Sequence, residues 1–220
     1  MYDFVRGPLV WVAFLVFILG TAYQVYRFYR LSRPRERYRL RIPFGKPPKE
    51  PQEAPAEPEL TWWQQVQLSV AGRNPVMIAV TTVFHLALVL MPLFVLGHNV
   101  LLDIAWHASL PSLPEAVADG LTVAVLAGGL FFLLRRIVLA RVRAISTAYD
   151  YLVLLIATAP FITGFLAYHH LFDYDTVVLL HMLAGEIMLM AIPFTKLVHM
   201  PFYFINRFVL VHENTMGSGG

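Results

Sequence analysis

The chain has 220 residues, of which 58% are hydrophobic and only 14% are charged. Soluble domains are about half apolar and about a quarter charged, so this composition favours a protein that lies in a lipid bilayer. The net charge of +3 does not indicate nucleic-acid binding, because the basic residues flank apolar runs and no nucleic-acid-binding motif is present.

Five apolar runs predict an all-α fold, an integral membrane bundle of five transmembrane helices. Each run approaches or exceeds the roughly 20 residues that a helix needs to cross the hydrocarbon core. The runs are Leu9–Tyr26, Val76–Leu102, Leu121–Leu139, Tyr151–Leu171 and Thr176–Met200. The first run loosely imitates a signal peptide, but it lacks a small-x-small cleavage site and ends in an aromatic and basic anchor. We therefore expect it to be retained as a helix.

The basic residues predict the orientation of the bundle. All 17 lysines and arginines except Arg6 lie between helices one and two, between helices three and four, or at the end of helix five. The opposite loops, Asp103–Asp119 and Phe172–Asp175, contain acidic residues and no lysine or arginine. The positive-inside rule then places the N-terminus outside and the C-terminus in the cytoplasm, in a multi-pass protein of the cytoplasmic (inner) membrane.

The chain divides into four segments. They are the first helix (residues 1–30), a cytoplasmic loop (31–75), a domain of four membrane helices (76–210) and a flexible C-terminal tail (211–220). Within the loop, Arg33–Arg41 is basic and is expected to contact anionic lipid headgroups or an acidic partner. The following segment, Lys46–Leu60, is rich in Pro and Glu and reads as an extended tether.

Four histidines lie in or at the edges of the second and fifth runs: His85, His98, His181 and His199. Because the chain has no cysteine, thiolate zinc sites, cysteine-ligated iron–sulfur clusters and covalent c-type haem are excluded. An imidazole within hydrocarbon is costly unless it has a partner. A single such residue is equally well explained by a hydrogen bond to a neighbouring helix. Two pairs on two helices favour metal ligation.

The spacing of these histidines predicts which of them meet. His181 and His199 are 18 residues apart, so on one continuous helix they would share a face and be separated by about 27 Å of rise. The second helix runs the opposite way, which places His85 near the cytoplasm and His98 near the outside. The predicted pairs are therefore His85 with His199 and His98 with His181, each holding one haem b near one face of the membrane.

The interval between His85 and His98 fits this arrangement less well. Thirteen residues on an ideal helix leave the two rings about 140° out of phase. Pro92 lies between them and would realign the rings if it kinked or unwound the helix. The alternative is that only His85 is a ligand, and that His98 is a polar residue at the helix end.

Other polar residues have two interpretations each. Glu186, the one acidic residue inside a run, either hydrogen-bonds to a neighbouring helix or water, or acts as a proton relay or quinol ligand beside the outer haem. His169 and His170 are either solvated loop residues or, with Gly97 and Glu186, candidates for an external quinone or proton-exchange site.

Two arginines lie at the predicted cytoplasmic end of the third helix. Arg135 and Arg136 either extend to lipid headgroups or neutralise the propionates of the inner haem.

Three stretches of the chain match one family of membrane cytochromes. They are Phe84–His85 through Gly97–His98, Gly128–Asp150 and Leu180–His199, within residues 76–210. On these residues the chain resembles the gamma subunit of membrane-bound respiratory nitrate reductase. It also resembles the related cytochrome b subunits of the Dsr, Hmc and Tmc complexes of sulfate reducers. The resemblance implies the same topology and the same four axial histidines.

In this family the subunit exchanges electrons between the quinone pool, or a periplasmic cytochrome c, and a cytoplasmic iron–sulfur partner. Two departures favour the sulfate-reducer branch. The histidines of the second helix are farther apart here than in the nitrate reductase branch, and Leu113–Gly120 has no lysine where that branch carries one. The sulfate-reducer branch implies that a periplasmic multihaem cytochrome c or menaquinone is linked to a cytoplasmic iron–sulfur subunit resembling heterodisulfide reductase.

The expected function is transmembrane electron transfer by a redox subunit of a membrane-bound oxidoreductase complex. One alternative is a non-redox membrane anchor whose histidines only hydrogen-bond between helices. A small transporter would require inverted repeats and broken helices around a midplane site, and the sequence pattern indicates neither.

Overall fold

The computed structural model describes residues 2–32, 61, 63–64, 67 and 70–205. In this part of the chain the regular structure is helical, without strands. Five stretches are long and apolar enough to cross a membrane: Tyr2–Leu31, Pro75–Phe94, Glu115–Val138, Ala148–Tyr168 and Tyr174–Phe194. The structure therefore confirms the predicted all-α fold and the five helices long and apolar enough to cross a membrane. The expected basic segment and tether, within 33–60, and the expected tail, 211–220, lie outside the described residues.

Several of the five spans are built from more than one helical element. The first comprises α1 (Tyr2–Phe4), the π-helical turn η1 (Val5–Leu9) and α2 (Val10–Ser32). The next elements are α4 (Val70–Arg73), α5 (Pro75–Phe94), α6 (Leu96–Trp106), α7 (Glu115–Val138), α8 (Ala140–Ala144) and α9 (Ala148–Tyr168). The chain continues with α10 (Tyr174–Ala191), the 3₁₀ turns η2 (Ile192–Phe194) and η3 (Lys196–Val198), and α11 (His199–Ile205).

Local sequence signals explain where the helices begin. Pro75 occupies the first turn of α5, where its missing N–H is not needed. Thr147 and Asp150 form a capping box at the start of α9. Asp173 caps α10 by accepting a hydrogen bond from the Thr176 backbone N–H at 3.0 Å, and this hydrogen bonding holds the pKa of the Asp173 carboxyl below its usual value.

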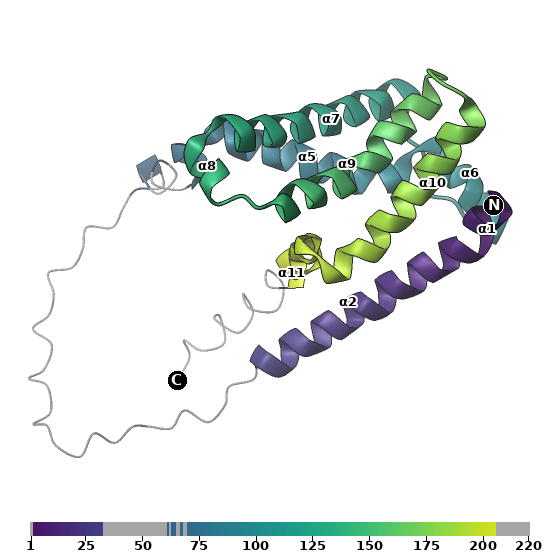
Figure 1. Cartoon of the computed structure of the whole chain (residues 1–220), viewed down its shortest axis with the longest axis horizontal. Helices are drawn as coiled ribbons and strands as arrows, with labels where there is room; N and C mark the ends of the chain where they lie inside the picture. The colour runs from purple at the N-terminus through teal and green to yellow at the C-terminus, as the bar shows by residue number, and fades with distance from the viewer. Residues whose placement is uncertain (1, 33–60, 62, 65–66, 68–69, 206–220) are drawn as a thin grey trace, which may run out of the picture.

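The helices α5, α7, α9 and α10 pack side by side, and α2 lies along α10 at the edge of this group (Figure 1). A core cluster of buried residues lies among α5, α7 and α9: Phe84, Ala87, Met91, Ala118, Val125 and Phe161. Large apolar side chains such as Leu86, Leu130 and Leu155 are exposed on the outer helix faces. Such an outer surface is suited to lipid.

Small residues allow the helices to approach closely. A Cβ atom on Gly128 of α7 would lie 2.8 Å from Cδ2 of Phe84, and one on Gly129 would lie 2.7 Å from Cγ2 of Thr158. On α2, a Cβ atom on Gly20 would lie 2.7 Å from Cγ of Pro193. Glycine at these contacts is typical of packing between membrane helices.

The second span is interrupted beyond Pro92. Helix α5 ends at Phe94, Val95 is extended with φ −72° and ψ 135°, and α6 starts at Leu96. His98 therefore lies on a helix separate from the one that carries His85. The interruption that the sequence suggested near Pro92 is present, three residues after the proline.

The prediction of one continuous fifth helix from His181 to His199 is wrong. Helix α10 ends at Ala191, Thr195 is extended, and His199 begins α11. Pro193 cannot donate a backbone hydrogen bond, and its own carbonyl accepts one from Nε2 of Gln24 at 2.7 Å. The 27 Å rise calculated for a continuous helix therefore does not apply.

The Gly128 contact predicts a stability change. Gly128→Ala should destabilise the protein by about 1–3 kcal/mol, because the added methyl group would push α7 away from the buried Phe84 ring. Gly120→Ala on the same helix is the matched control. A Cβ there meets nothing within 4 Å, so this variant should be unchanged or more stable by about 0.5–1 kcal/mol. Denaturant unfolding in detergent measures both, and equal stability of the two variants would contradict the packing described.

Candidate functional site

The four intramembrane histidines lie in two pairs in space. The rings of His85 and His199 have centroids 5.8 Å apart and planes at 81°. The rings of His98 and His181 have centroids 5.9 Å apart and planes at 27°. These are the two pairs that the sequence predicted, although His98 and His199 reach them from the short helices α6 and α11.

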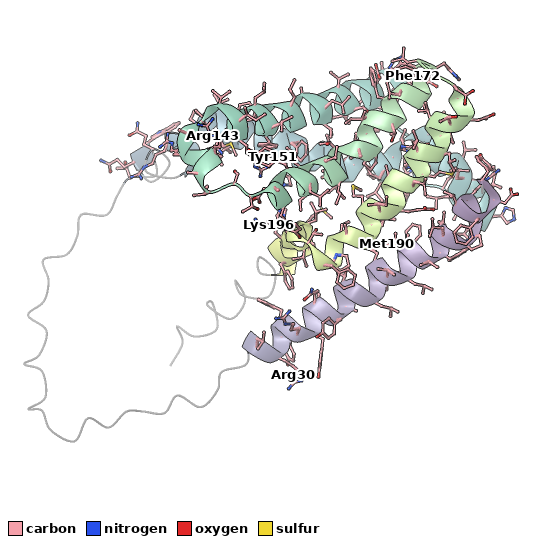
Figure 2. All side chains as sticks on the ribbon, in the orientation of Figure 1. Arg30, Arg143, Tyr151, Phe172, Met190 and Lys196 are labelled. Carbon is pink, nitrogen blue, oxygen red and sulfur yellow. The ribbon has the colours of Figure 1, made fainter. Side chains whose placement is uncertain are left out.

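The two pairs lie toward different ends of α10. Helix α6 lies beside the first part of α10, where His98 meets His181, and α11 lies beyond the last part of α10, after the turns η2 and η3 (Figure 1). Charge separates the ends in the same way. Figure 2 shows Arg143 and Phe172 at opposite ends of the helix group. Arg143 follows three other arginines in α7 and α8, and Phe172 precedes Asp173 in the chain. The His98–His181 pair is thus nearer the acidic end, and the His85–His199 pair is nearer the basic end.

Each of the four rings places Nδ1 against a backbone carbonyl. The distances are 2.8 Å from His85 to Thr81, 2.9 Å from His98 to Pro92, 2.9 Å from His181 to Pro160 and 2.6 Å from His199 to Lys196. A carbonyl only accepts hydrogen bonds, so Nδ1 must carry the hydrogen. In the neutral ring Nε2 then holds the free lone pair. This is the tautomer of a metal-binding histidine whose second nitrogen is fixed by an outer-shell acceptor.

The spacing of each pair fits one metal ion between two rings. Among the described residues, no hydrogen-bond partner is found for Nε2 of any of the four histidines. Imidazole nitrogens bind metals at about 2 Å, as known for zinc, so two rings on opposite sides of one ion have centroids about 6 Å apart. The observed separations of 5.8 and 5.9 Å match this value.

The described residues contain no group of three or more His, Asp or Glu side chains that could hold a metal ion. Each pair therefore offers two imidazole ligands, one from each ring. A planar macrocycle that supplies the remaining ligands, such as haem, suits this donor set.

Helix α9 shapes the surroundings of His181. A Cβ atom on Gly164 would lie 3.0 Å from Cε1 of the His181 ring, so any larger residue would require this ring to shift by a few tenths of an ångström. The Thr163 hydroxyl is 3.3 Å from Nδ1 of His181 and donates to the carbonyl of Ala159 at 2.8 Å. Sequence reasoning missed these α9 residues, because their role depends on a helix that packs across the chain.

An ion pair holds the segment that carries His199. Nζ of Lys196 lies 2.6 Å from Oδ1 of Asp150 at the start of α9. The other carboxylate oxygen of Asp150 accepts from the backbone N–H and the hydroxyl of Thr147, both at 2.9 Å. Asp150 thus starts α9 and also ties the 3₁₀ turn before His199 to it, which the sequence did not reveal.

The two arginines expected near the inner haem lie in the last turn of α7. Nη1 of Arg136 donates to the backbone carbonyl of Asp150 at 3.4 Å, close to the Lys196–Asp150 ion pair. Arg135 is partly buried at the same end of α7. Their contact with propionates stays a prediction.

No hydrogen bond, ion pair or ring contact joins Glu186, Gly97 and the His169–His170 pair, the residues suggested for a quinone or proton site, in the described part of the chain. Glu186 is 4% exposed, and both of its carboxylate oxygens lack a hydrogen-bond partner among the described residues. His169 pairs with Asp119 at 2.9 Å and so links the end of α9 to the start of α7. His170 stacks on Tyr174.

The last member of that candidate site, Gly97, is exposed, and a Cβ atom there would meet nothing within 4 Å. These residues therefore remain separate candidates. A shared quinone or proton site stays a prediction.

The fold and the site define a multi-pass α-helical membrane protein with two histidine pairs between its helices. No family model matches the sequence. The chain is 37% identical over 223 residues to a protein of Nitratidesulfovibrio vulgaris (strain Hildenborough), and the alignment covers 100% of this chain and 96% of that relative. The chain belongs to the same family as that protein. The relative's name, "Protein", states no activity, so the similarity supports kinship and leaves the function to be argued from the site.

Cysteine cross-linking can test the pairing, and it requires no bound cofactor. The chain has no cysteine of its own, so only the introduced thiols can react. The double variants His85→Cys/His199→Cys and His98→Cys/His181→Cys should each be linked within one chain by a short bifunctional thiol reagent. The mismatched variants His85→Cys/His181→Cys and His98→Cys/His199→Cys are the controls and should not be linked. Mass spectrometry of the digested protein measures the links, and linkage of the mismatched pairs would show that the pairing is wrong.

Proposed function

We propose that this chain is a di-haem b-type cytochrome of the cytoplasmic membrane that carries electrons across the bilayer. The observation that supports this most strongly is the shared geometry of the four histidines. They form two facing pairs with metal-compatible spacing, and a carbonyl fixes Nδ1 of every ring so that Nε2 is free to bind a metal. His85 and His199 would hold one haem, and His98 and His181 would hold the other.

When bound, haem b supplies a one-electron couple at each site. The protein contributes the two axial ligands, the orientation of their rings and the polarity around them. The hydrogen bonds from Nδ1 to carbonyls fix each ring and raise the basicity of the ligating nitrogen. The apolar packing of α5, α7, α9 and α10 partly buries the rings of His85, His98 and His181, whereas His199 is exposed, and this difference in burial would tune the two reduction potentials differently.

The charges at the two ends support an orientation for this transfer. With the N-terminus outside and the C-terminus in the cytoplasm, the acidic end faces outward and the basic end faces the cytoplasm. The His98–His181 site would then exchange electrons with menaquinone, menaquinol or a periplasmic multihaem cytochrome c. The His85–His199 site would exchange electrons with a cytoplasmic iron–sulfur subunit resembling heterodisulfide reductase. Arg135 and Arg136 would neutralise propionates at this inner site.

A non-redox membrane anchor is the alternative function. In such a protein the histidines should hydrogen-bond between helices that pack side by side. Only His181 does so, through the Pro160 carbonyl of α9. His85 and His199 bond to carbonyls four and three residues earlier in their own segments, and His98 bonds to the carbonyl of Pro92 across the α5–α6 break. These local bonds orient the rings and contribute little to helix association.

The two helix interruptions are a feature that transporters also show. Here they lie at Val95 and Thr195, each just beyond a membrane-spanning stretch, Pro75–Phe94 or Tyr174–Phe194. A transporter would place them near the midplane, around a substrate site. Their position outside these stretches favours a structural role, because each interruption precedes the short helix that bears His98 or His199.

Optical spectra test the proposed function. The purified protein should show a b-type α-band in the reduced-minus-oxidised spectrum, with two haems per chain. His98→Ala and His181→Ala should lose the same haem, and His85→Ala and His199→Ala should lose the other. His107→Ala, at the exposed end of α6, is the control and should keep both. A wild-type protein without a b-type band would contradict the cytochrome, and loss of different haems in His98→Ala and His181→Ala would contradict the pairing.

The ring angles predict that the two haems differ in electron paramagnetic resonance. The relative orientation of two axial imidazole planes sets the splitting of the iron d orbitals in low-spin ferric haem. The 81° pair should give a strongly axial signal with a large highest g value, and the 27° pair should give an ordinary rhombic signal. His199→Ala should remove the first signal and His181→Ala the second. Two identical signals in the wild-type protein would contradict the ring geometry.

A further inference from the structure

The break between α5 and α6 leaves three backbone carbonyls at the end of α5 without partners in their own helix. Near the membrane such groups are costly, because little water is present to hydrogen-bond with them. Each of the three accepts a hydrogen bond from beyond α5. Pro92 accepts from Nδ1 of His98 at 2.9 Å, Leu93 from Nδ2 of Asn99 at 3.2 Å, and Phe94 from the backbone N–H of Leu113 at 2.8 Å.

Asn99 makes one of these contacts and two further hydrogen bonds around the break. Its side-chain amide donates to the carbonyls of Leu93 and Val95 at 3.2 and 3.3 Å, and its Oδ1 accepts from the backbone N–H of Leu110 at 2.9 Å. The residue is 2% exposed. An amide combines two donors with an acceptor, which no apolar side chain of similar size provides. Asn99 thus joins the end of α5, the start of α6 and the loop that follows α6.

The break changes the direction in which His98 points. On an uninterrupted helix His98 would be about 140° out of phase with His85, and the two rings would not face partners on the same side. With the break at Val95 held by these hydrogen bonds, the ring centroids of His98 and His181 are 5.9 Å apart. Asn99 follows His98 directly, so the bonds that hold Asn99 also hold the turn that carries the histidine.

We propose that Asn99 is a positioning residue for the His98–His181 site, where its side-chain amide closes the α5–α6 break and so sets the position and plane of the His98 ring. This inference rests on the proposed haem function for its spectroscopic consequence, but the positional consequence stands without it. The effect is confined to one site, because His199 is held by a different device, the Lys196–Asp150 ion pair.

The test replaces Asn99 in the full chain. Asn99→Leu keeps a branched side chain of four heavy atoms and removes the hydrogen bonds, whereas Asn99→Gln keeps the amide. In Asn99→Leu the rhombic signal of the His98–His181 haem should be lost or shifted, with haem per chain falling by up to half, while the axial signal is unchanged. Asn99→Gln should restore part of the lost signal. Thr122→Val is the matched control, because the buried Thr122 hydroxyl donates only to Ala118 in its own helix, and both signals should persist.

The outcomes separate this proposal from the proposed function. A wild-type protein without haem contradicts the cytochrome, and the positional claim is then decided by cysteine linking. The Asn99→Leu exchange should abolish linking of His98→Cys/His181→Cys and leave linking of His85→Cys/His199→Cys intact. Unchanged linking, unchanged signals, or equal loss at both sites would overturn the role of Asn99.

A milder variant serves if Asn99→Leu does not accumulate in the membrane. Leu110→Pro removes the backbone donor to Oδ1 of Asn99 from an exposed loop position and leaves Asn99 itself in place. Leu110→Pro should shift the rhombic signal of the His98–His181 haem and leave the His85–His199 signal unchanged. If haem is absent, it should reduce cross-linking of His98→Cys/His181→Cys and leave that of His85→Cys/His199→Cys unchanged. An unaltered His98–His181 site in Leu110→Pro would overturn the proposal.

Discussion

The need to satisfy backbone carbonyls where water is scarce is the constraint on which this structure depends. A membrane helix meets this need internally, but an interrupted helix does not. In this chain the freed carbonyl of Pro92 accepts a hydrogen bond from His98, one of the four histidines of the proposed haem sites. The same hydrogen bond therefore satisfies the backbone and fixes the imidazole tautomer. The helix interruption and the orientation of His98 therefore depend on the same hydrogen bond.

The two histidine pairs are built differently. The His98–His181 pair is supported by the break beside Asn99 and by the close approach of Gly164. The His85–His199 pair includes an exposed ring, His199, on a short helix tied to α9 through Lys196. The exposed ring brings the His85–His199 pair nearer to solvent than the His98–His181 pair, whose two rings are both partly buried.

The first membrane helix takes part in this arrangement. Gly20 of α2 admits the ring of Pro193, and Gln24 donates to the Pro193 carbonyl across 169 residues of sequence. These contacts lie at the turn where the fifth span leaves its helical path toward His199. Helix α2 thus acts as a support for the turn that positions one ligand, in addition to crossing the membrane.

The sequence by itself determined the five apolar spans, their charged ends and the two histidine pairs, because these depend on residue type and spacing along the chain. Only the tertiary structure decided that the fifth helix ends before His199, with Thr195 extended, and that the interruption suggested by Pro92 lies at Val95. Periodicity assumes a continuous helix, and a break is stable only where distant groups satisfy the freed carbonyls. Those groups, such as Leu113 for Phe94 and Gln24 for Pro193, are brought into place by packing and have no local sequence signal.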